Sequence, residues 1–185
     1  ILVGEYYNQN HQEIKKECER LSIDFISTPY HYDDVDFLYK LGVSQFKIAS
    51  GQITELPFLE YVAKKGKPMI ISTGMATMSE VFEATETIKA INSDLMVLQC
   101  TTNYPSLIEE ANINAMLSIK HACKVDVGYS DHVENNYACY AAVALGAKVI
   151  EKHFTLDKTL PGPDHICSLD PKGFYQMVHG IRQIE

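Results

Sequence analysis

The sequence predicts an α/β fold built around a parallel sheet, and two observations lead to that prediction. Six apolar segments recur along the chain, and each ends in small or polar residues before a helical stretch begins. Runs such as Pro-Met-Ile-Ile and Leu-Met-Val-Leu are continuously apolar, as expected for parallel strands buried on both faces. We expect strands at Phe25–Thr28, Phe46–Ser50, Met69–Thr73, Met96–Thr101, Val125–Tyr129 and Val149–Phe154.

The stretches between these segments carry helical signals. Thr77 and Glu80 have the spacing of a capping box, and Asp170 stands before Pro171 as an N-cap before a first helical proline. Apolar residues recur at helical spacing downstream of these starts. We expect helices over residues 11–21, 77–91, 136–145 and 170–184. Strands alternating with helices favour parallel pairing through right-handed crossovers.

The sheet could be open and doubly wound, or closed into a barrel. An open sheet of this kind commonly carries a Gly-rich phosphate loop, and no G-x-G-x-x-G or Walker sequence occurs. Polar residues instead follow every expected strand, which is where a barrel places its active site. A (β/α)8 barrel has eight strands and roughly 250 residues, so we expect about two βα units to be missing at the N-terminus. Residues 1–185 are then one partial barrel domain.

Composition narrows the classes of partner. The formal net charge of −8 argues against nucleic acid or an acidic membrane surface. No apolar run approaches the roughly 20 residues of a membrane helix. The five cysteines are odd in number and form no C-x-x-C, which indicates reduced thiols in a cytoplasm. We therefore expect a cytoplasmic protein that binds small molecules.

Hydroxyl side chains follow all six expected strands. One such residue is usually a turn or a helix cap, but six of them beside Lys47 predict a pocket for a small anion. Lys47 lies within an apolar strand, so its ammonium either reaches out to the rim or contacts a phosphate or carboxylate. Lys47 and Ser50 have opposite parity, so both face the pocket only if the strand ends near Ile48.

Two histidines end consecutive expected strands. His132 and His153 would lie on neighbours about 4.8 Å apart, close enough to share one divalent ion. The alternative is two separately hydrogen-bonded imidazoles. Asp131 beside His132 could orient it. The proline-rich loop 156–168, which contains Asp164, either positions a substrate or is a surface connection.

Ordered motifs along the chain resemble those of one family. The motifs are Phe-Ile-Ser-Thr-Pro (25–29), Lys-Ile-Ala-Ser-Gly (47–51), Ser-Thr-Gly-Met (72–75), Cys-Thr-Thr-Asn-Tyr-Pro (100–105), Gly-Tyr-Ser-Asp-His (128–132), Glu-Lys-His-Phe-Thr-Leu-Asp-Lys (151–158) and Pro-Gly-Pro-Asp-His (161–165). Any one of them is modest, but the ordered set resembles the catalytic barrel of the N-acetylneuraminate (sialic acid) synthase family. The likeness covers nearly the whole chain from about residue 11.

The resemblance implies strands 3 to 8 of a TIM (β/α)8 barrel. It also implies that strands 1 and 2, with a glutamate and a second lysine, are absent. A C-terminal antifreeze-like domain, which supplies an arginine to the partner subunit of a homodimer, would be absent too. The chain would then be a fragment of its enzyme.

The resemblance also implies roles for particular residues. Phosphoenolpyruvate would be bound by Thr28, Lys47, Ser50, Ser72, Thr102 and Ser130. The sugar would meet Gln52, Asn103, Tyr104 and Asp164. His132 and His153 would hold a divalent metal, Mn²⁺ or alternatively Mg²⁺ or Co²⁺, and would act with Lys47 in catalysis. Family members often have an acidic residue in place of Gln52, so the acceptor sugar stays open.

The implied activity is condensation of phosphoenolpyruvate with N-acetylmannosamine or a related acylated amino sugar, releasing phosphate. The alternatives are a synthase that takes a phosphorylated sugar, a metal-dependent aldolase barrel, and a non-catalytic scaffold. A phosphorylated sugar calls for a second cationic cluster, and the only arginines, Arg20 and Arg182, both fall in helical stretches. Retention of Lys47 and both histidines argues against a scaffold.

Overall fold

Five parallel strands and seven α-helices make up the part of the chain that the structure describes. The computed structural model describes residues 2–185, with side chains from Asn10 onward. The helices are α1 (Leu2–Arg20), α2 (Tyr32–Leu41), α3 (Leu56–Ala63), α4 (Met78–Lys89), α5 (Asn114–Cys123), α6 (Tyr137–Ala144) and α7 (Pro171–Ile184). The strands are β1 (Phe46–Ile48), β2 (Met69–Ser72), β3 (Leu95–Cys100), β4 (Asp126–Asp131) and β5 (Ile150–Lys152). Short 3-10 helices follow β1 (η1, Ser50–Gln52) and β3 (η2, Ile108–Glu110).

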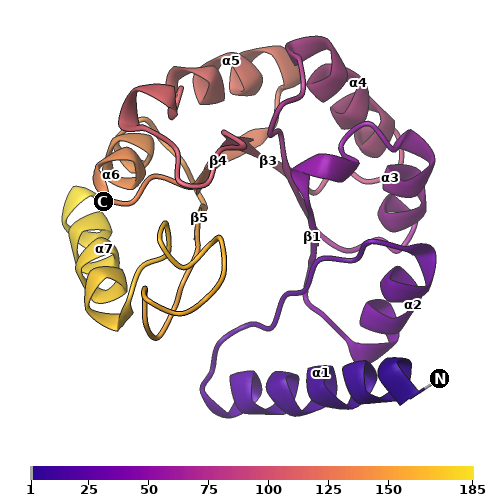
Figure 1. The fold of residues 1–185 in the computed structure, drawn as a ribbon. Helices are drawn as coiled ribbons and strands as arrows, with labels where there is room; N and C mark the ends of the chain where they lie inside the picture. Colours follow the sequence, from indigo (N-terminus) through magenta and orange to yellow (C-terminus); the bar gives the residue numbers. More distant parts are fainter. Residues whose placement is uncertain (1) are drawn as a thin grey trace.

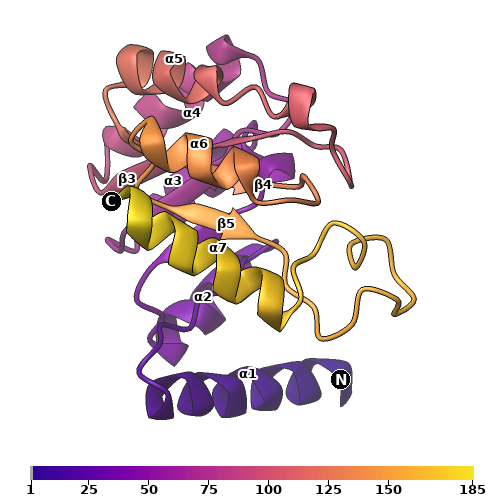
Figure 2. The ribbon, with the colours of Figure 1, turned by 90° about the vertical axis from the view of Figure 1, so that its left-hand side faces the viewer.

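The strands form one curved sheet in the order β1-β2-β3-β4-β5. Figure 1 shows them on the inside of an arc whose outside carries α2 to α7, with α1 and α7 at its two ends. All strands point the same way, so their carboxyl ends share one edge of the sheet. The loop between β5 and α7 projects beyond that edge (Figure 2). The fold is a curled parallel half-barrel of the α/β class, as the sequence predicts.

The first expected strand, Phe25–Thr28, is not a strand. Within the described residues, no backbone–backbone hydrogen bond joins residues 24–29 to another segment. A strand needs a hydrogen-bonded ladder with a neighbour, which composition alone does not provide. The expected count of six strands is therefore wrong for this structure, and the other five segments are β1 to β5.

The four expected helices correspond to α1, α4, α6 and α7, although α1 begins earlier than expected, and α2, α3 and α5 had no expected range. α4 begins at the expected capping box, where the Glu80 N–H donates to Thr77 Oγ1 at 3.3 Å and the Thr77 N–H donates to Glu80 Oε2 at 2.7 Å. The contacts with Thr77 hold the pKa of Glu80 below its usual range. Asp170 caps α7 by accepting the Gly173 N–H at 2.7 Å. Gly42 ends α2 at φ +80°, a conformation that favours glycine.

The main core lies between the sheet and helices α2 to α5. Strand residues such as Phe46 and Ile71 are fully buried against Ile88 of α4 and Met116 of α5. Each such side chain contributes roughly 1.5–3 kcal/mol through burial of apolar surface. This outer core holds the strands in register, so the inner side and the carboxyl edge are left for polar groups.

Two sequence expectations concern the membrane and the cysteines. Among the helices of residues 2–185, none combines the length and apolar character needed to cross a lipid bilayer. All five cysteines are free thiols, and four of them are buried.

Candidate active site

A cavity of about 310 Å³ lies at the carboxyl edge of the sheet, where barrel enzymes place their chemistry. Side chains from all five strand ends reach it. Of the twelve residues singled out from the sequence, eight line it: Thr28, Lys47, Ser50, Ser72, Tyr104, Ser130, His132 and His153. Tyr30, Ala49, Cys100, Glu151 and Lys152 complete the wall. The chain therefore gathers residues that are up to 125 positions apart, from Thr28 to His153.

Lys47 brings a positively charged ammonium group to the wall of this cavity. β1 ends at Ile48 and η1 begins at Ser50, so Lys47 and Ser50 both line the cavity despite their opposite parity. The Lys47 side chain is 11% exposed, and its Nζ lies 2.8 Å from Ser72 Oγ, 3.0 Å from the Ile48 carbonyl and 3.4 Å from Glu151 Oε2. The charge is thus held in place from three sides and kept at the cavity wall.

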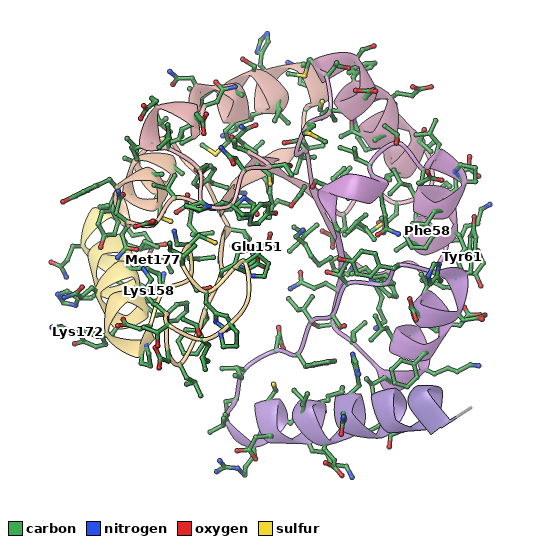
Figure 3. All side chains as sticks on the ribbon, in the orientation of Figure 1. Phe58, Tyr61, Glu151, Lys158, Lys172 and Met177 are labelled. Carbon is green, nitrogen blue, oxygen red and sulfur yellow. The ribbon has the colours of Figure 1, made fainter. Side chains whose placement is uncertain are left out.

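Glu151 is a site residue that sequence reasoning missed. Its Oε2 pairs with Lys47, and its Oε1 accepts the Ser130 hydroxyl at 2.6 Å. Figure 3 shows Glu151 on the inner side of the arc. One signal could have found it: Glu151 and His153 are two residues apart on one strand, so they face the same side.

The two histidines come together beside Tyr104. The ring centroids of His132 and His153 are 5.3 Å apart, and the Tyr104 ring is 4.0 Å from His132 and 5.6 Å from His153. His132 Nδ1 lies 2.7 Å from the Thr101 carbonyl, which can only accept, so Nδ1 carries the proton. This contact leaves His132 Nε2 as the nitrogen with a free lone pair.

Burial sets the protonation of this corner. Burial lowers the pKa of His132, while the Thr101 carbonyl opposes that shift and nearby His153 adds to it. Burial, with a smaller contribution from nearby Cys100 and Asp164, raises the pKa of Tyr104 to about 12. A neutral imidazole next to an un-ionised phenol suits a metal ligand beside a hydrogen-bond donor.

The residues partly fit a divalent metal. Two imidazoles, one of them oriented by a backbone carbonyl, are the nitrogen ligands that first-row metals accept. In the part of the chain that the structure describes, no group of three or more His, Cys, Asp or Glu side chains converges as a complete shell. Asp164 approaches the pair, with its Oδ2 3.8 Å from His153 Nδ1. The chain thus offers two ligands and leaves the other positions to oxygen atoms from elsewhere.

Gln52 and Asn103, two residues expected at the sugar, lie outside the cavity wall. Gln52 donates its amide to the Tyr30 carbonyl at 3.0 Å, and its buried Oε1 has no partner in the structure. Asn103 donates to Glu110 Oε2 at 2.9 Å, and this contact is the main reason that the pKa of Glu110 lies below its usual range. Both amides are therefore engaged with the loops around the cavity.

Thr102 and Asp164, the other two, do not line this cavity either. Thr102 lines a neighbouring cavity of about 460 Å³. Gly74 has φ +54°, and a Cβ there would sit 2.5 Å from Ser50 Cβ and 2.8 Å from Thr102 Oγ1. Only glycine lets the loop after β2 pass this close to Ser50. Asp164 is exposed on the loop after β5, and its carboxylate lies 3.8 Å from His153 Nδ1.

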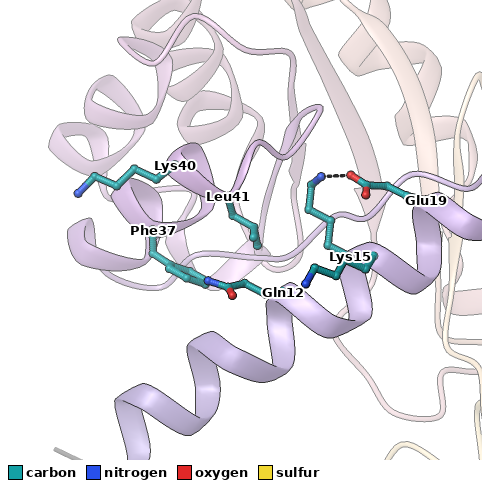
Figure 4. A pocket seen from close by; sticks show the side chains of 7 residues that line it. Gln12, Lys15, Glu19, Phe37, Lys40 and Leu41 are labelled. Carbon is teal, nitrogen blue, oxygen red and sulfur yellow. Dashed lines mark hydrogen bonds and ion pairs between the residues drawn. The ribbon is translucent and has the colours of Figure 1, made fainter.

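A separate cavity of about 390 Å³ lies between α1 and α2 (Figure 4). Its floor is apolar, from Phe37 and Leu41, and its rim carries Gln12, Lys15, Lys16, Glu19 and Lys40. Lys15 is paired with Glu19 there. All of its lining residues belong to α1 and α2, so it is separate from the strand ends.

Known proteins share this sequence and fold. An N,N'-diacetyllegionaminic acid synthase from Campylobacter jejuni is 47% identical over 178 residues, which is 95% of this chain and 53% of that protein. The human N-acetylneuraminate-9-phosphate synthase is 37% identical over 182 residues, 98% of this chain and 51% of its own. The chain spans about half the length of the curated relatives it matches.

A solved structure supports the same assignment. The N-acetylneuraminic acid synthetase of Leptospira borgpetersenii, in complex with citrate, matches with a TM-score of 0.92 at 33% identity. The match covers 96% of this chain and 62% of that one. The model of the NeuB family matches residues 5–185. The ordered strand-end motifs thus predicted the relationship correctly, and the chain belongs to the NeuB family.

Proposed function

We propose that the whole protein is a sialic acid-type synthase, which condenses phosphoenolpyruvate with an acylated amino sugar and releases phosphate. The observation that carries this proposal is the meeting of Lys47, the hydroxyls and the two histidines in one cavity of a NeuB-family chain. The names of the relatives, a legionaminic acid synthase and a neuraminate synthase, support the substrate class.

The phosphoenolpyruvate end of the site is assigned to Lys47 and the hydroxyls around it. An ammonium held at 11% exposure interacts strongly with an anion because little water screens it. Ser72 is within 2.8 Å of it, and Ser50, Thr28 and Ser130 line the same wall. Glu151 limits this positive charge, and its bond from Ser130 must loosen if that hydroxyl is to donate to phosphate. We place Thr102 at the carboxylate.

The metal is assigned to His132 and His153. When bound there, Mn²⁺, or alternatively Mg²⁺ or Co²⁺, supplies a Lewis acid for the aldehyde oxygen of the open-chain sugar. His132 is prepared for this by its Nδ1–H bond to the Thr101 carbonyl, which leaves Nε2 as the nitrogen with a free lone pair for the metal. Tyr104 packs on both rings and fixes their planes.

The reaction then needs positioning above all. C3 of phosphoenolpyruvate forms a bond to the aldehyde carbon, water adds at C2, and phosphate leaves with cleavage of its bond to C2. Lys47 and the hydroxyls hold the phosphate so that the enol faces the aldehyde. From the likeness to the family, we assign the sugar to Gln52, Asn103, Tyr104 and Asp164, of which Tyr104 lines the cavity and Asp164 lies 3.8 Å from His153.

The wider architecture is also a proposal. We place β1 to β5 as strands 4 to 8 of an eight-stranded barrel, with residues 25–28 at the position of strand 3. An additional antifreeze-like domain and a homodimer complete the sugar site in this scheme. Light scattering, which measures the molar mass of the whole protein in solution, tests whether it is a homodimer.

The first experiment measures phosphate release by the whole protein with phosphoenolpyruvate and Mn²⁺. The acceptors are N-acetylmannosamine, its diacetylated 6-deoxy relatives, a phosphorylated N-acetylmannosamine and arabinose 5-phosphate. Release with one unphosphorylated, acylated amino sugar supports the proposal and names the acceptor. Release only with a phosphorylated sugar favours a synthase that takes phosphorylated sugars. The name of the human relative, an N-acetylneuraminate-9-phosphate synthase, is consistent with that alternative. No release with any acceptor contradicts both.

We expect an unphosphorylated acceptor. Both arginines are exposed, Arg20 on α1 and Arg182 on α7, and each is paired with a glutamate on its own element or terminus. Neither lines the cavity, so no arginine of this chain is available there for a second phosphate.

A further inference from the structure

The residue between Glu151 and His153 is a lysine whose side chain is fully buried. Lys152 Nζ lies 2.7 Å from Asp131 Oδ2, and both side chains have 0% exposure. Ionised groups are rarely buried so completely unless they are paired. Neither residue has a part in the proposed chemistry, so this pair calls for a separate explanation.

The ammonium of Lys152 holds the segment that follows β4. Besides Asp131, Lys152 Nζ donates to the backbone carbonyl of Val133 and, at 3.3 Å, to that of Asn135. Its contacts thus reach positions 131, 133 and 135, on both sides of His132. One ammonium therefore fixes the backbone that carries the imidazole.

Asp131 completes the same network. Its Oδ1 accepts the Val133 N–H at 3.1 Å and the Tyr129 hydroxyl at 2.9 Å, while Oδ2 accepts the Cys139 thiol at 3.1 Å as well as Lys152. Burial raises the pKa values of Tyr129 and Cys139, so both remain protonated donors. All the oxygen capacity of the carboxylate is used within the fold.

Strand alternation turns Tyr129 and Asp131 away from the cavity, although Lys152 also borders it. Asp131 pairs with Lys152 across the β4–β5 ladder. Tyr129 and Asp131 face α6. Tyr129 packs with Ala138, and Asp131 accepts the Cys139 thiol. The residues between and beside them, which include Ser130 and His132, line the cavity. The buried pair therefore lies directly behind the face that presents the site.

We infer that Lys152 and Asp131 are positioning residues that hold His132 with Nδ1 on the Thr101 carbonyl and Nε2 toward the cavity. His132 is otherwise held by its carbonyl, which accepts the Ser106 N–H at 3.0 Å, by its own Nδ1–H bond, and by the Tyr104 ring that packs on the imidazole. The Nδ1–H bond depends on where the backbone places the ring, and the Lys152 ammonium sets that placement. The consequence for catalysis rests on the proposed function, but the orientation of the ring does not.

The test compares four variants of the whole protein. Lys152→Met removes the ammonium, and Lys152→Met with Asp131→Asn removes both charges but keeps an oxygen that can accept the Val133 N–H. Lys152→Arg restores a cation. Lys148→Met is the matched control, because Lys148 pairs with Asp126 at the same 2.7 Å and joins the same strand region, but with side chains 59% and 48% exposed.

Two readouts report on His132 itself. Long-range ¹H–¹⁵N NMR, with the His132 signal assigned by its loss in His132→Gln, shows which ring nitrogen carries the proton. Calorimetry with Mn²⁺ alone measures the affinity. We expect the wild type and Lys148→Met to show the Nδ1–H form. In Lys152→Met we expect a mixture of tautomers and roughly 10- to 100-fold weaker Mn²⁺ binding.

The double variant separates positioning from stability. Removing both charges relieves the unpaired buried carboxylate, so its melting temperature should recover toward the wild type. The carbonyls of Val133 and Asn135 still lack their donor, so the tautomer and the Mn²⁺ affinity should not recover. In Lys152→Arg, the Nδ1–H tautomer and the Mn²⁺ affinity should both recover in part.

The opposite results overturn the inference. Recovery of tautomer and affinity together with melting temperature would show that the pair acts only on stability. An unchanged His132 signal in Lys152→Met would show that the ammonium does not set the ring. A locked His132 that loosens in Lys152→Met, in a protein that releases no phosphate with any acceptor, supports the inference and contradicts the proposed function.

Discussion

The β4–β5 region contains two lysine–aspartate pairs with the same 2.7 Å distance at opposite edges of the sheet. Lys148 and Asp126, at the amino edge, are about half exposed, whereas Lys152 and Asp131, at the carboxyl edge, are fully buried. An exposed pair contributes little because water screens it, and a buried pair constrains its surroundings because neither partner can be left alone. The same kind of ion pair thus contributes little at the amino edge and constrains the surrounding structure at the carboxyl edge.

The largest effect should come from the carboxyl edge. Lys47→Ala should lower kcat/KM for phosphoenolpyruvate by roughly 100- to 1000-fold, because a preorganised charge at the reacting ligand is lost. The melting temperature should move by only a few degrees. Steady-state kinetics and calorimetry on the whole protein measure both.

Lys148→Ala is the control for Lys47→Ala, because it removes a lysine from the amino edge. It should leave kinetics and melting temperature near the wild type. If Lys47→Ala lost stability and activity in equal proportion, Lys47 would be a structural lysine and the contrast between the edges would fail.

The amino edge should show the reverse pattern. Asn92 donates its amide to the Lys67 carbonyl at 2.7 Å and accepts the Asp94 N–H at 3.0 Å, so it joins the turns that lead into β2 and β3. Asn92→Ala should cost about 1 kcal/mol in the free energy of unfolding. Its kcat and KM should not change. Chemical denaturation and kinetics measure these, and Ser93→Ala, the adjacent exposed residue, should change neither.

The smallest effect concerns a third pair, on the outer helices. Asp36 of α2 accepts from Lys65 at 2.5 Å and from the Tyr61 hydroxyl at 2.8 Å, and these bonds, that from Lys65 first, hold the pKa of Asp36 below its usual range. A lowered pKa favours the folded state fully above the unfolded value near 4, and this contribution is lost as the pH falls through the folded value.

The test is the slope of melting temperature against pH. Asp36→Asn should flatten that slope below about pH 4, where the wild type loses the carboxylate contribution. Tyr61→Phe removes only the lesser donor and should flatten it less. A slope identical to the wild type in Asp36→Asn would show that the pair does not stabilise the fold.

Local signals were sufficient for much of the fold. Capping residues such as Thr77 and Asp170 act within one turn of their helix, so the sequence predicts them directly. Strands β1 to β5 were predicted because short, continuously apolar runs between helices are typical of parallel strands buried on both faces. The strand predicted at Phe25–Thr28 was wrong because a strand also needs a neighbouring strand to pair with. That neighbour lies far away in the sequence, so a local pattern cannot reveal it.

The site shows the same division. The strand-end hydroxyls, Lys47 and both histidines were predicted, since strand ends meet in any parallel barrel. Glu151 and the partner of Asp131, Lys152, were not, because the sequence does not reveal which distant charge each one meets. Their partners lie 104 and 21 positions away, respectively. The alternation of β5 brings Glu151 to Lys47, and the register of β5 against β4 pairs Lys152 with Asp131.

That register limits how enzymes of this shape can be re-engineered. Glu151, Lys152 and His153 serve cavity, interior and cavity in turn, so inserting or deleting one residue at the start of β5 would exchange all three roles together. Loops at the mouth can be lengthened or grafted without this penalty, because they leave the alternation intact. Under the proposed function, libraries aimed at new acceptor sugars should therefore vary the loops that carry Gln52 and Asp164 and keep the length of every strand fixed.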